Sequence, residues 1–139
     1  MEINTYLTFD GTARAAITFY AKVFGTEPIA MMTFGEMPDG GAPDPALQDR
    51  IAHARIRVHG RDLMVSDTGP WSPHQGFAGF NIQVDCDSVN EAHDVFAALS
   101  EGGEITMPMA ETFWAPAFGM CKDQFGVPWM VNCDTQSNA

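Results

Sequence analysis

The order of strand-like and helix-like segments repeats once along this chain of 139 residues. Residues 3–9 alternate between apolar and polar side chains, as a half-buried strand does, and residues 11–24 carry apolar side chains at the spacing of an amphipathic helix. Strand-like segments at 28–34, 51–59 and 62–67 follow. The first half therefore predicts a βαβββ module.

The second half shows the same order. Residues 80–84 alternate as a strand, and Ser88-Val89-Asn90-Glu91 is a capping-box signature that indicates the start of a helix. Gly102-Gly103 is expected to end this helix. Three further strands are predicted at 104–109, 118–122 and 127–133. We interpret the repeat as an internal duplication.

Together the two halves predict one domain over residues 1–139. It consists of module 1–68 and module 77–135, joined by a linker rich in Gly and Pro between Thr68 and Gly76. The predicted fold class is α+β, with two tandem βαβββ modules that form a curved mixed sheet around a central cavity. A functional site is expected on the inner face of that sheet.

Local patterns in the first module predict a cap, a turn and the orientation of the first strand. Asp10 or Thr12 is the candidate cap of the helix, and His59-Gly60-Arg61 is typical of a tight hairpin turn. Alternation in the first strand places Ile3 on the same face as Leu7.

The charge of the chain argues against two classes of partner. It carries 18 acidic residues against 7 Lys and Arg, for a formal net charge of -11. Because this charge repels a phosphate backbone and anionic lipid headgroups, nucleic acid and membrane are not expected as partners. An apolar run of the roughly 20 residues that would cross a bilayer is missing, as is a leader segment, so we expect a cytoplasmic protein.

The three cysteines, Cys86, Cys121 and Cys133, show neither a C-x-x-C spacing nor a disulfide framework. A reactive thiol needs a nearby base, and the local sequence supplies none. We expect reduced, buried thiols.

Several strings of the sequence are similar to the PhnB-like branch of the vicinal-oxygen-chelate superfamily, which contains glyoxalases, bleomycin-resistance proteins and extradiol dioxygenases. These strings cover nearly the whole chain: Tyr6-Leu7-Thr8-Phe9-Asp10-Gly11, Phe34-Gly35-Glu36-Met37-Pro38, His53-Ala54-Arg55, Leu63-Met64-Val65-Ser66-Asp67, Glu111-Thr112-Phe113-Trp114-Ala115, and the run from Phe118-Gly119-Met120 through Asp123 to Asn132. The resemblance implies the glyoxalase/bleomycin resistance fold and a homodimer with pockets shared between subunits. Similar sequences are often described as demethylubiquinone methyltransferases. The sequence does not support that activity, because no Gly-rich loop leads from a strand into a helix.

Metalloenzymes that this chain resembles hold a divalent ion with one ligand on each of four strands. When the alternation of each strand and the internal repeat are used to map the four ligand positions, they fall at Asn4 or Thr5, Met64, Gly79 and Met130. Gly and Met offer neither a hard oxygen nor an imidazole nitrogen. No metal site and no other cofactor are therefore predicted.

The strand 51–59 carries the polar candidates. Alternation directs four residues toward the helix, namely Ala52, Ala54, Ile56 and Val58, and leaves four on the opposite face, namely His53, Arg55, Arg57 and His59. His53 is a candidate for ligand binding or proton transfer, with a structural histidine as the alternative. The four arginines in and around this strand, Arg50, Arg55, Arg57 and Arg61, form either an anion-binding wall or a solvated edge.

The apolar candidates lie in both modules. Phe113 and Trp114 occupy a Pro-limited loop where a pocket rim is expected, and the alternative is a core or dimer contact. Glu111 beside them is the best-placed acid for proton transfer, so His53 and Glu111 are the weak catalytic candidates. The full set of predicted ligand-binding residues is Tyr6, His53, Arg55, Met64, Phe113, Trp114, Phe118, Met120 and Met130, of which the methionines could equally be ordinary core.

Three functions remain open from the sequence, which does not decide whether the chain is an enzyme. The first hypothesis is a homodimeric small-molecule-binding protein with no obligatory metal. The second is a metal-dependent lyase or dioxygenase-type enzyme that uses non-standard ligands such as His53 and Glu111. The third is a resistance protein that sequesters a bulky aromatic drug without converting it.

Overall fold

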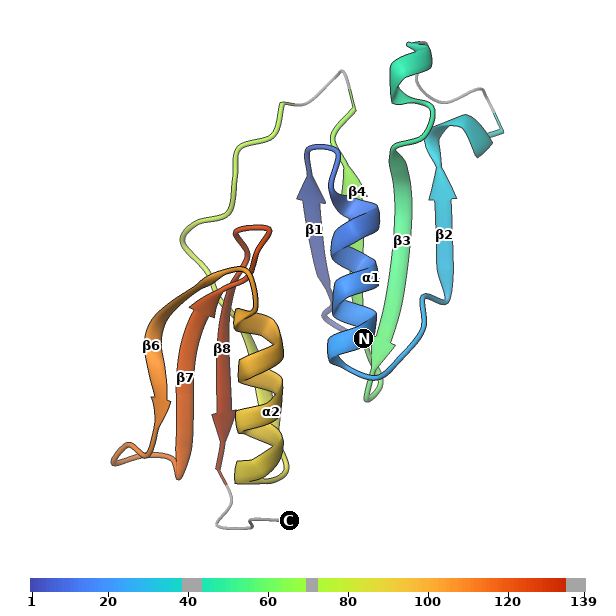
Figure 1. Cartoon of the computed structure of the whole chain (residues 1–139). Coiled ribbons are helices and arrows are strands. Elements are labelled where there is room, and N and C mark those ends of the chain that lie inside the picture. Colours follow the sequence, from blue (N-terminus) through green and yellow to red (C-terminus); the bar gives the residue numbers. More distant parts are fainter. Residues whose placement is uncertain (39–43, 70–72, 135–139) are drawn as a thin grey trace. The chain divides into compact units, whose positions relative to one another are not determined.

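The computed structural model describes residues 1–38, 44–69 and 73–134. It divides the chain into two compact units, Met1–Gln75 and Gly76–Ala139, which are shown in Figure 1. Parts of the predicted loop at 36–49 and of the predicted linker, together with residue 135 of the second module, lie outside the described residues.

The first unit is a four-stranded sheet with one helix. Its elements in chain order are β1 (Thr5–Phe9), α1 (Ala13–Val23), β2 (Ala30–Thr33), the 3-10 turns Phe34–Glu36 and Pro45–Leu47, β3 (Ile51–Val58) and β4 (Arg61–Asp67). The strand order is β1-β4-β3-β2, in which β1 is parallel to β4 and the other pairs are antiparallel. The helix α1 packs on β3 and β4.

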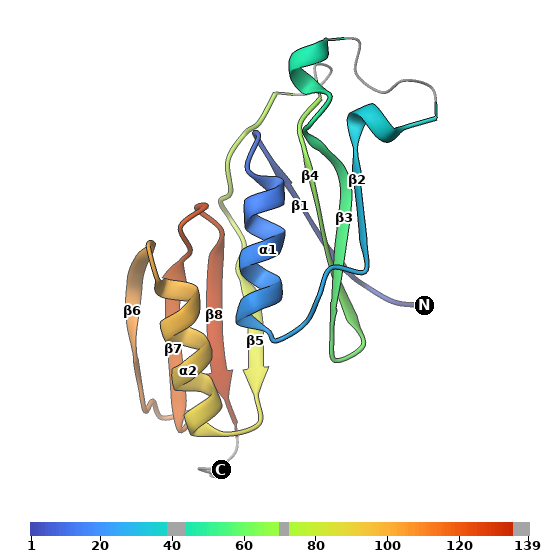
Figure 2. The ribbon, with the colours of Figure 1, turned by 45° about the vertical axis from the view of Figure 1, so that its right-hand side comes forward.

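The second unit repeats this plan. Its elements are β5 (Ile82–Cys86), α2 (Val89–Ser100), β6 (Glu104–Ala110), β7 (Ala117–Lys122) and β8 (Pro128–Cys133), in the sheet order β5-β8-β7-β6. Again the first strand is parallel to the last, and the helix crosses one face of its own sheet (Figure 2). The predicted α+β class with two βαβββ modules is therefore confirmed.

The start of α1 differs from the prediction. Thr12 occupies the N-cap position but its side chain makes no capping bond, and Asp10 instead forms an ion pair with Arg50 at 2.9 Å. The buried carboxylate of Asp67, at the end of β4, accepts hydrogen bonds from the amides of Gly11 and Ala13 at 2.8 and 3.0 Å. A residue far along the chain thus satisfies the free amides at this helix terminus, and local sequence could not reveal it.

The start of α2 follows the prediction. Ser88 accepts a hydrogen bond from the amide of Glu91 at 3.0 Å, and the Glu91 carboxylate accepts one from the amide of Asp87 at 3.1 Å. A local capping signature was enough here because every partner lies within one helical turn.

The hairpin turn between β3 and β4 is confirmed. His59 and Gly60 both have positive φ, at 48° and 79°, as the two central residues of a type I′ turn require. Arg61 already belongs to β4.

The orientation of two strands needs correction. Thr33 pairs with Ile51 whereas Met32 pairs with His53, so Ala52 is an extra residue in β3, and Ile51 is buried in its place. Beyond the bulge the side chains of β3 alternate between the two faces as predicted, since Ala54 and Ile56 are fully buried. Ile3 precedes β1 and is 86% exposed, so it does not share the buried face of Leu7.

The core of each unit lies between its sheet and its helix. In the first unit it includes Leu7, Phe9, Ala16, Ile17, Tyr20, Ile56 and Val65, and in the second Phe96, Leu99, Cys121, Trp129, Val131 and Cys133. At Gly119 a Cβ atom would lie 2.9 Å from the Phe96 ring and 3.1 Å from the Cα of Met109. Glycine is needed there because β6 and α2 both approach β7 closely.

All three cysteines are unpaired and buried, as predicted. Burial raises the pKa of the Cys86 thiol to about 12 and also raises the pKa of Cys121. Since the thiolate is the reactive form, we expect native protein at about pH 8 to react with Ellman's reagent at well under one thiol per chain, and unfolded protein to react at all three. Fast reaction of a native thiol would contradict this packing.

Within the described ranges, no helix has the length and apolar character that crossing a membrane requires.

Candidate functional site

The face of the first sheet opposite α1 brings four predicted residues together. In the strand register, Tyr6 of β1 lies beside Met64 of β4, and Met64 lies beside Arg55 of β3. The neighbours of Met64 in β4, Leu63 and Val65, are buried beneath α1, so Met64 faces the other way. These side chains form one row across the sheet.

His53 joins this row through Tyr6. The hydroxyl oxygen of Tyr6 lies 3.3 Å from Nδ1 of His53, and the two ring centroids are 5.8 Å apart. Tyr6 is 47% exposed, so the pair is open to solvent on its outer side. The structure therefore places His53 on the predicted face, in contact with a predicted ligand-binding residue.

The arginines on this face share a single buried carboxylate. Arg57 binds Asp62 through two nitrogen atoms, Nε at 2.7 Å and Nη2 at 3.2 Å, whereas Arg55 reaches it only through Nη1 at 3.4 Å. The hydrogen bonds from Arg57 hold the pKa of Asp62 below its ordinary value, so this carboxyl is ionised. Two guanidinium groups thus share this carboxylate, and Glu2 adds a second negative charge that acts on Arg57.

The face of the second sheet opposite α2 carries another row of predicted residues. Met120 of β7 lies beside Met130 of β8, and Phe118 lies beside Asn132. Gln83 and Asp85 of β5 continue these two rows. Both methionines are half-buried, so the apolar lining predicted for this sheet is present on one face.

Three aromatic rings meet at the end of the second sheet, and we call Phe113, Trp114 and Phe118 the aromatic corner. Trp114 packs edge-on against both neighbours, with ring centroids 4.7 Å from Phe113 and 5.3 Å from Phe118. Phe118 is buried, whereas Trp114 is 51% and Phe113 97% exposed. Two large rings thus face solvent while the third anchors them to β7.

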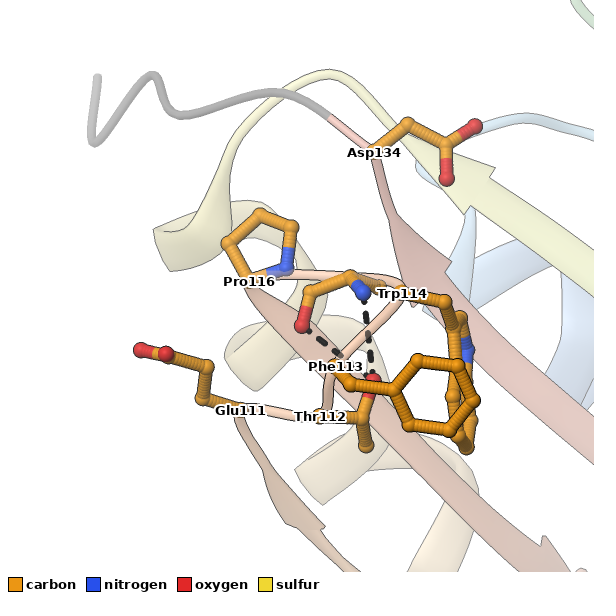
Figure 3. Close-up of a pocket in the computed structure, with 7 residues that line it drawn as sticks. Glu111, Thr112, Phe113, Trp114, Pro116 and Asp134 are labelled. Carbon is orange, nitrogen blue, oxygen red and sulfur yellow. Dashed lines mark hydrogen bonds between the residues drawn. The ribbon is translucent and has the colours of Figure 1, made fainter.

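The loop that presents these rings is held by its own hydrogen bonds. The amide of Thr112 donates to the carbonyl of Ala115 at 2.9 Å, and the amide of Ala115 donates to the Thr112 hydroxyl at 3.1 Å. Pro116 follows and limits the backbone further. The exposed rings therefore sit on a closed turn whose backbone is fixed before any ligand binds (Figure 3).

A hollow of about 310 Å³ opens beside this turn. It is lined by Glu111, Thr112, Phe113, Trp114, Ala115, Pro116 and Asp134. Two of these residues are acids, and Figure 3 shows the Glu111 side chain directed away from the rings of Phe113 and Trp114. His53, the other weak catalytic candidate, belongs to the first unit.

Asn132 is a polar residue of β8 that is not among the predicted site residues. Its amide nitrogen donates to Asp85 at 3.1 Å and to Asp134 at 2.8 Å, while its buried Oδ1 has no hydrogen-bond partner among the described residues. The available signal was a polar residue between Val131 and Cys133 in an otherwise apolar strand.

The positions at which related metalloenzymes place ligands do not fit a hard divalent ion. The strand register pairs Met64 with Tyr6 and Met130 with Gln83. Gln83 therefore holds the ligand position that the repeat predicted at Gly79, a residue that precedes β5. Thioether, phenol and amide groups do not form the imidazole and carboxylate set that such an ion prefers. Over residues 1–38, 44–69 and 73–134, no group of three or more His, Cys, Asp or Glu is placed to hold a metal.

Comparison with solved structures identifies the fold. The chain is similar to a glyoxylase/bleomycin resistance protein/dioxygenase domain from Frankia sp. EAN1pec, with a TM-score of 0.68 and 11% identity over 97% of this chain and 92% of that one. At this identity the likeness concerns the fold alone, which both chains share.

A family model and two relatives of higher sequence identity identify the family. A family model described as 3-demethylubiquinone-9 3-methyltransferase matches residues 1–132. Protein YjdN of Escherichia coli K12 is 38% identical over 144 residues, covering 95% of each chain. Protein PA1353 of Pseudomonas aeruginosa is 43% identical, with a TM-score of 0.89 over 96% of this chain and 98% of that one. The chain belongs to this family, the PhnB-like branch that the sequence predicted.

The description of the family names a reaction that the site does not explain. The strands β1 and β5 connect to their helices through residues 10–12 and 87–88. Neither connection is the Gly-rich, phosphate-binding loop of a nucleotide-binding α/β fold.

Proposed function

We propose that this protein binds a small aromatic molecule, neutral or cationic, at the aromatic corner, and that this binding requires no metal. The single observation that supports the proposal best is the exposure of Phe113 and Trp114 on a turn that is already closed. Large apolar rings held in water are unfavourable unless a partner covers them for part of the time.

The apolar area sets the scale of the affinity. Covering about 200 Å² of aromatic surface contributes roughly 5 kcal/mol at about 25 cal/mol per Å². The loss of translational and rotational freedom opposes this gain by a comparable amount. We therefore expect dissociation constants between micromolar and millimolar for a ligand that contacts only the rings, and tighter binding for one that also uses polar groups.

The charge around the hollow selects the kind of ligand. Glu111 and Asp134 both line it, and the whole chain carries a formal charge of -11. An anion would be repelled there, whereas a cation would gain from the carboxylates and from the faces of the exposed rings. A neutral or cationic aromatic compound fits these observations.

The proposal includes a homodimer, which the family resemblance implies. Apart from the corner, the edge strand β6 exposes Ile105 and Met107 at 52% and 41%. An apolar edge of this kind is suited to a second copy of the chain. Light scattering of the purified protein gives the mass directly, and a monomer at tens of micromolar would contradict this part of the proposal.

Nile red, a neutral aromatic dye, tests the corner. We expect its emission to shift to the blue on binding, and Trp114→Ala to weaken binding about tenfold, because one stacking ring is worth about 1–1.5 kcal/mol. Phe113→Ser is a second variant that carries little risk to folding, since Phe113 is 97% exposed.

The matched control is Phe80→Ala. Phe80 is an exposed aromatic of the same unit, 39% exposed, but it precedes β5 at the end of the sheet opposite the corner. Loss of binding in Phe80→Ala with wild-type binding in both corner variants would place the dye elsewhere and overturn the proposal. Light scattering at each dye concentration shows whether dimer formation competes for the same rings.

A further inference from the structure

The helix-opposed face of the first sheet holds two guanidinium groups that share one buried carboxylate. Asp62, with a side chain only 7% exposed, is bound by Arg57 through two nitrogen atoms. Arg55 adds a single contact of 3.4 Å to the same carboxylate. Glu2 also acts electrostatically on Arg57, whereas Arg55 is the guanidinium of this pair with the longer contact to a carboxylate.

Arg55 also holds a donor that has no acceptor. Its Nε is buried without a hydrogen-bond partner among the described residues, while the side chain as a whole is 38% exposed. A buried donor without a partner on a charged group is unfavourable. A turn of the guanidinium toward an oxygen atom of a ligand would remove that cost, and the 3.4 Å contact to Asp62 offers little resistance.

An apolar wall stands beside this cation. Met64 lies next to Arg55 in the register and Tyr6 lies next to Met64, so the Tyr6 backbone is two strand spacings, about 10 Å, from that of Arg55. Tyr6 is 47% exposed and is fixed against Nδ1 of His53 at 3.3 Å. A flat ring over Met64 would reach from the guanidinium to the Tyr6–His53 pair.

We propose that Arg55 is the anchor of a second binding site, which takes a small aromatic carboxylate. Guanidinium and carboxylate match as two parallel hydrogen bonds, which lysine cannot reproduce. The ring of the ligand lies over Met64 and against Tyr6. The residues of this site belong to the first unit, whereas the aromatic corner belongs to the second unit and its hollow is lined by acids.

Benzoate is the probe, and the Nε–H signal of Arg55 in a nitrogen-15 correlation spectrum is the readout. The signal is assigned by its loss in Arg55→Lys. At about pH 7 benzoate is an anion, and we expect it to shift this signal with a dissociation constant of about 1 mM. Benzamide, which has the same shape without the charge, is expected to bind at least about tenfold more weakly.

The variants separate this site from the corner. We expect Arg55→Lys, followed through the methyl signal of Met64, to weaken benzoate binding about tenfold, since a single point charge replaces a fork. Arg61→Lys is the matched control, an exposed arginine at the adjacent turn, and should bind as wild type does. Folding is not at risk in Arg55→Lys because Arg57 still binds Asp62.

Three outcomes would overturn the inference: equal binding of benzoate and benzamide, unchanged binding by Arg55→Lys, or no shift of the Arg55 signal up to about 50 mM benzoate. If Trp114→Ala abolishes benzoate binding while Arg55→Lys retains it, the anion occupies the corner. That result would refute the Arg55 site and the charge preference proposed for the corner, while aromatic binding at the corner would stand.

Discussion

Asp67→Ala is expected to destabilise the protein by about 4 kcal/mol, because it removes the acceptor for three backbone amides. The carboxylate, 4% exposed, accepts hydrogen bonds from Gly11 at 2.8 Å, Ala13 at 3.0 Å and Ile51 at 2.9 Å. It thereby ties the end of β4 to the start of α1 and to the start of β3. Alanine leaves these donors without a partner and removes a negative charge from the helix N-terminus.

Urea unfolding followed by circular dichroism measures the loss, and hydrogen exchange at Ala13 and Ile51 locates it. Asp10→Ala is the matched control, since Asp10 lies at the same helix terminus but is exposed and makes one ion pair with Arg50. We expect that variant to lose less than about 1 kcal/mol. A loss below about 1.5 kcal/mol in Asp67→Ala would show that water or other groups replace the carboxylate.

Asp123→Ala is the second large effect, and it acts on the other unit. Asp123 is 3% exposed and its Oδ1 accepts from the amides of Phe125 and Val127 at 2.8 and 3.0 Å. Its Oδ2 accepts from the indole nitrogen of Trp129 at 2.8 Å. Since Trp129 is only 1% exposed, removal of the carboxylate takes a buried acceptor away from the indole donor. We expect a loss of about 4 kcal/mol.

Two further variants sharpen this test. In Asp123→Asn the amide keeps its shape but directs a donor at the Trp129 indole or at the loop amides, so we expect about half the loss. Asp94→Ala removes an exposed acid from α2 and should change stability by less than about 0.5 kcal/mol. Chevron measurements would then show whether the Asp123 turn forms before or after the folding transition state. Near-wild-type stability of Asp123→Ala would refute this account of the β7–β8 hairpin.

The two aspartates illustrate why some structural residues escape prediction. In the sequence Asp67 reads as the end of a strand and Asp123 as a turn residue, and the chain holds many other acids. Their importance comes from burial among amides contributed by separate segments. By contrast the Ser88 cap and the His59-Gly60 turn were predicted correctly, because their hydrogen bonds and backbone angles are local.

In the candidate site, too, some features follow from local sequence patterns and others depend on the tertiary structure. Strand phase placed Arg55 on the face opposite the helix, as the structure has it. The strand register brings Phe118, Met120 and Met130 to one face of the second sheet. The pairing of Tyr6 with His53 required the order of strands, which period alone does not reveal. Whether any of these residues binds a ligand remains the prediction that the dye and benzoate experiments address.

The sequence by itself determined the repeated βαβββ order, the family and the face on which most candidates lie, since periodicity and short motifs depend on neighbouring residues. Only the tertiary structure decided the bulge at Ala52, the capping of α1 by Asp67 and the shared carboxylate of Asp62. It also decided that Trp114 stays half-exposed while Phe118 is buried. These features depend on which distant segments meet and on how much water they exclude, and those quantities exist only once the chain is packed.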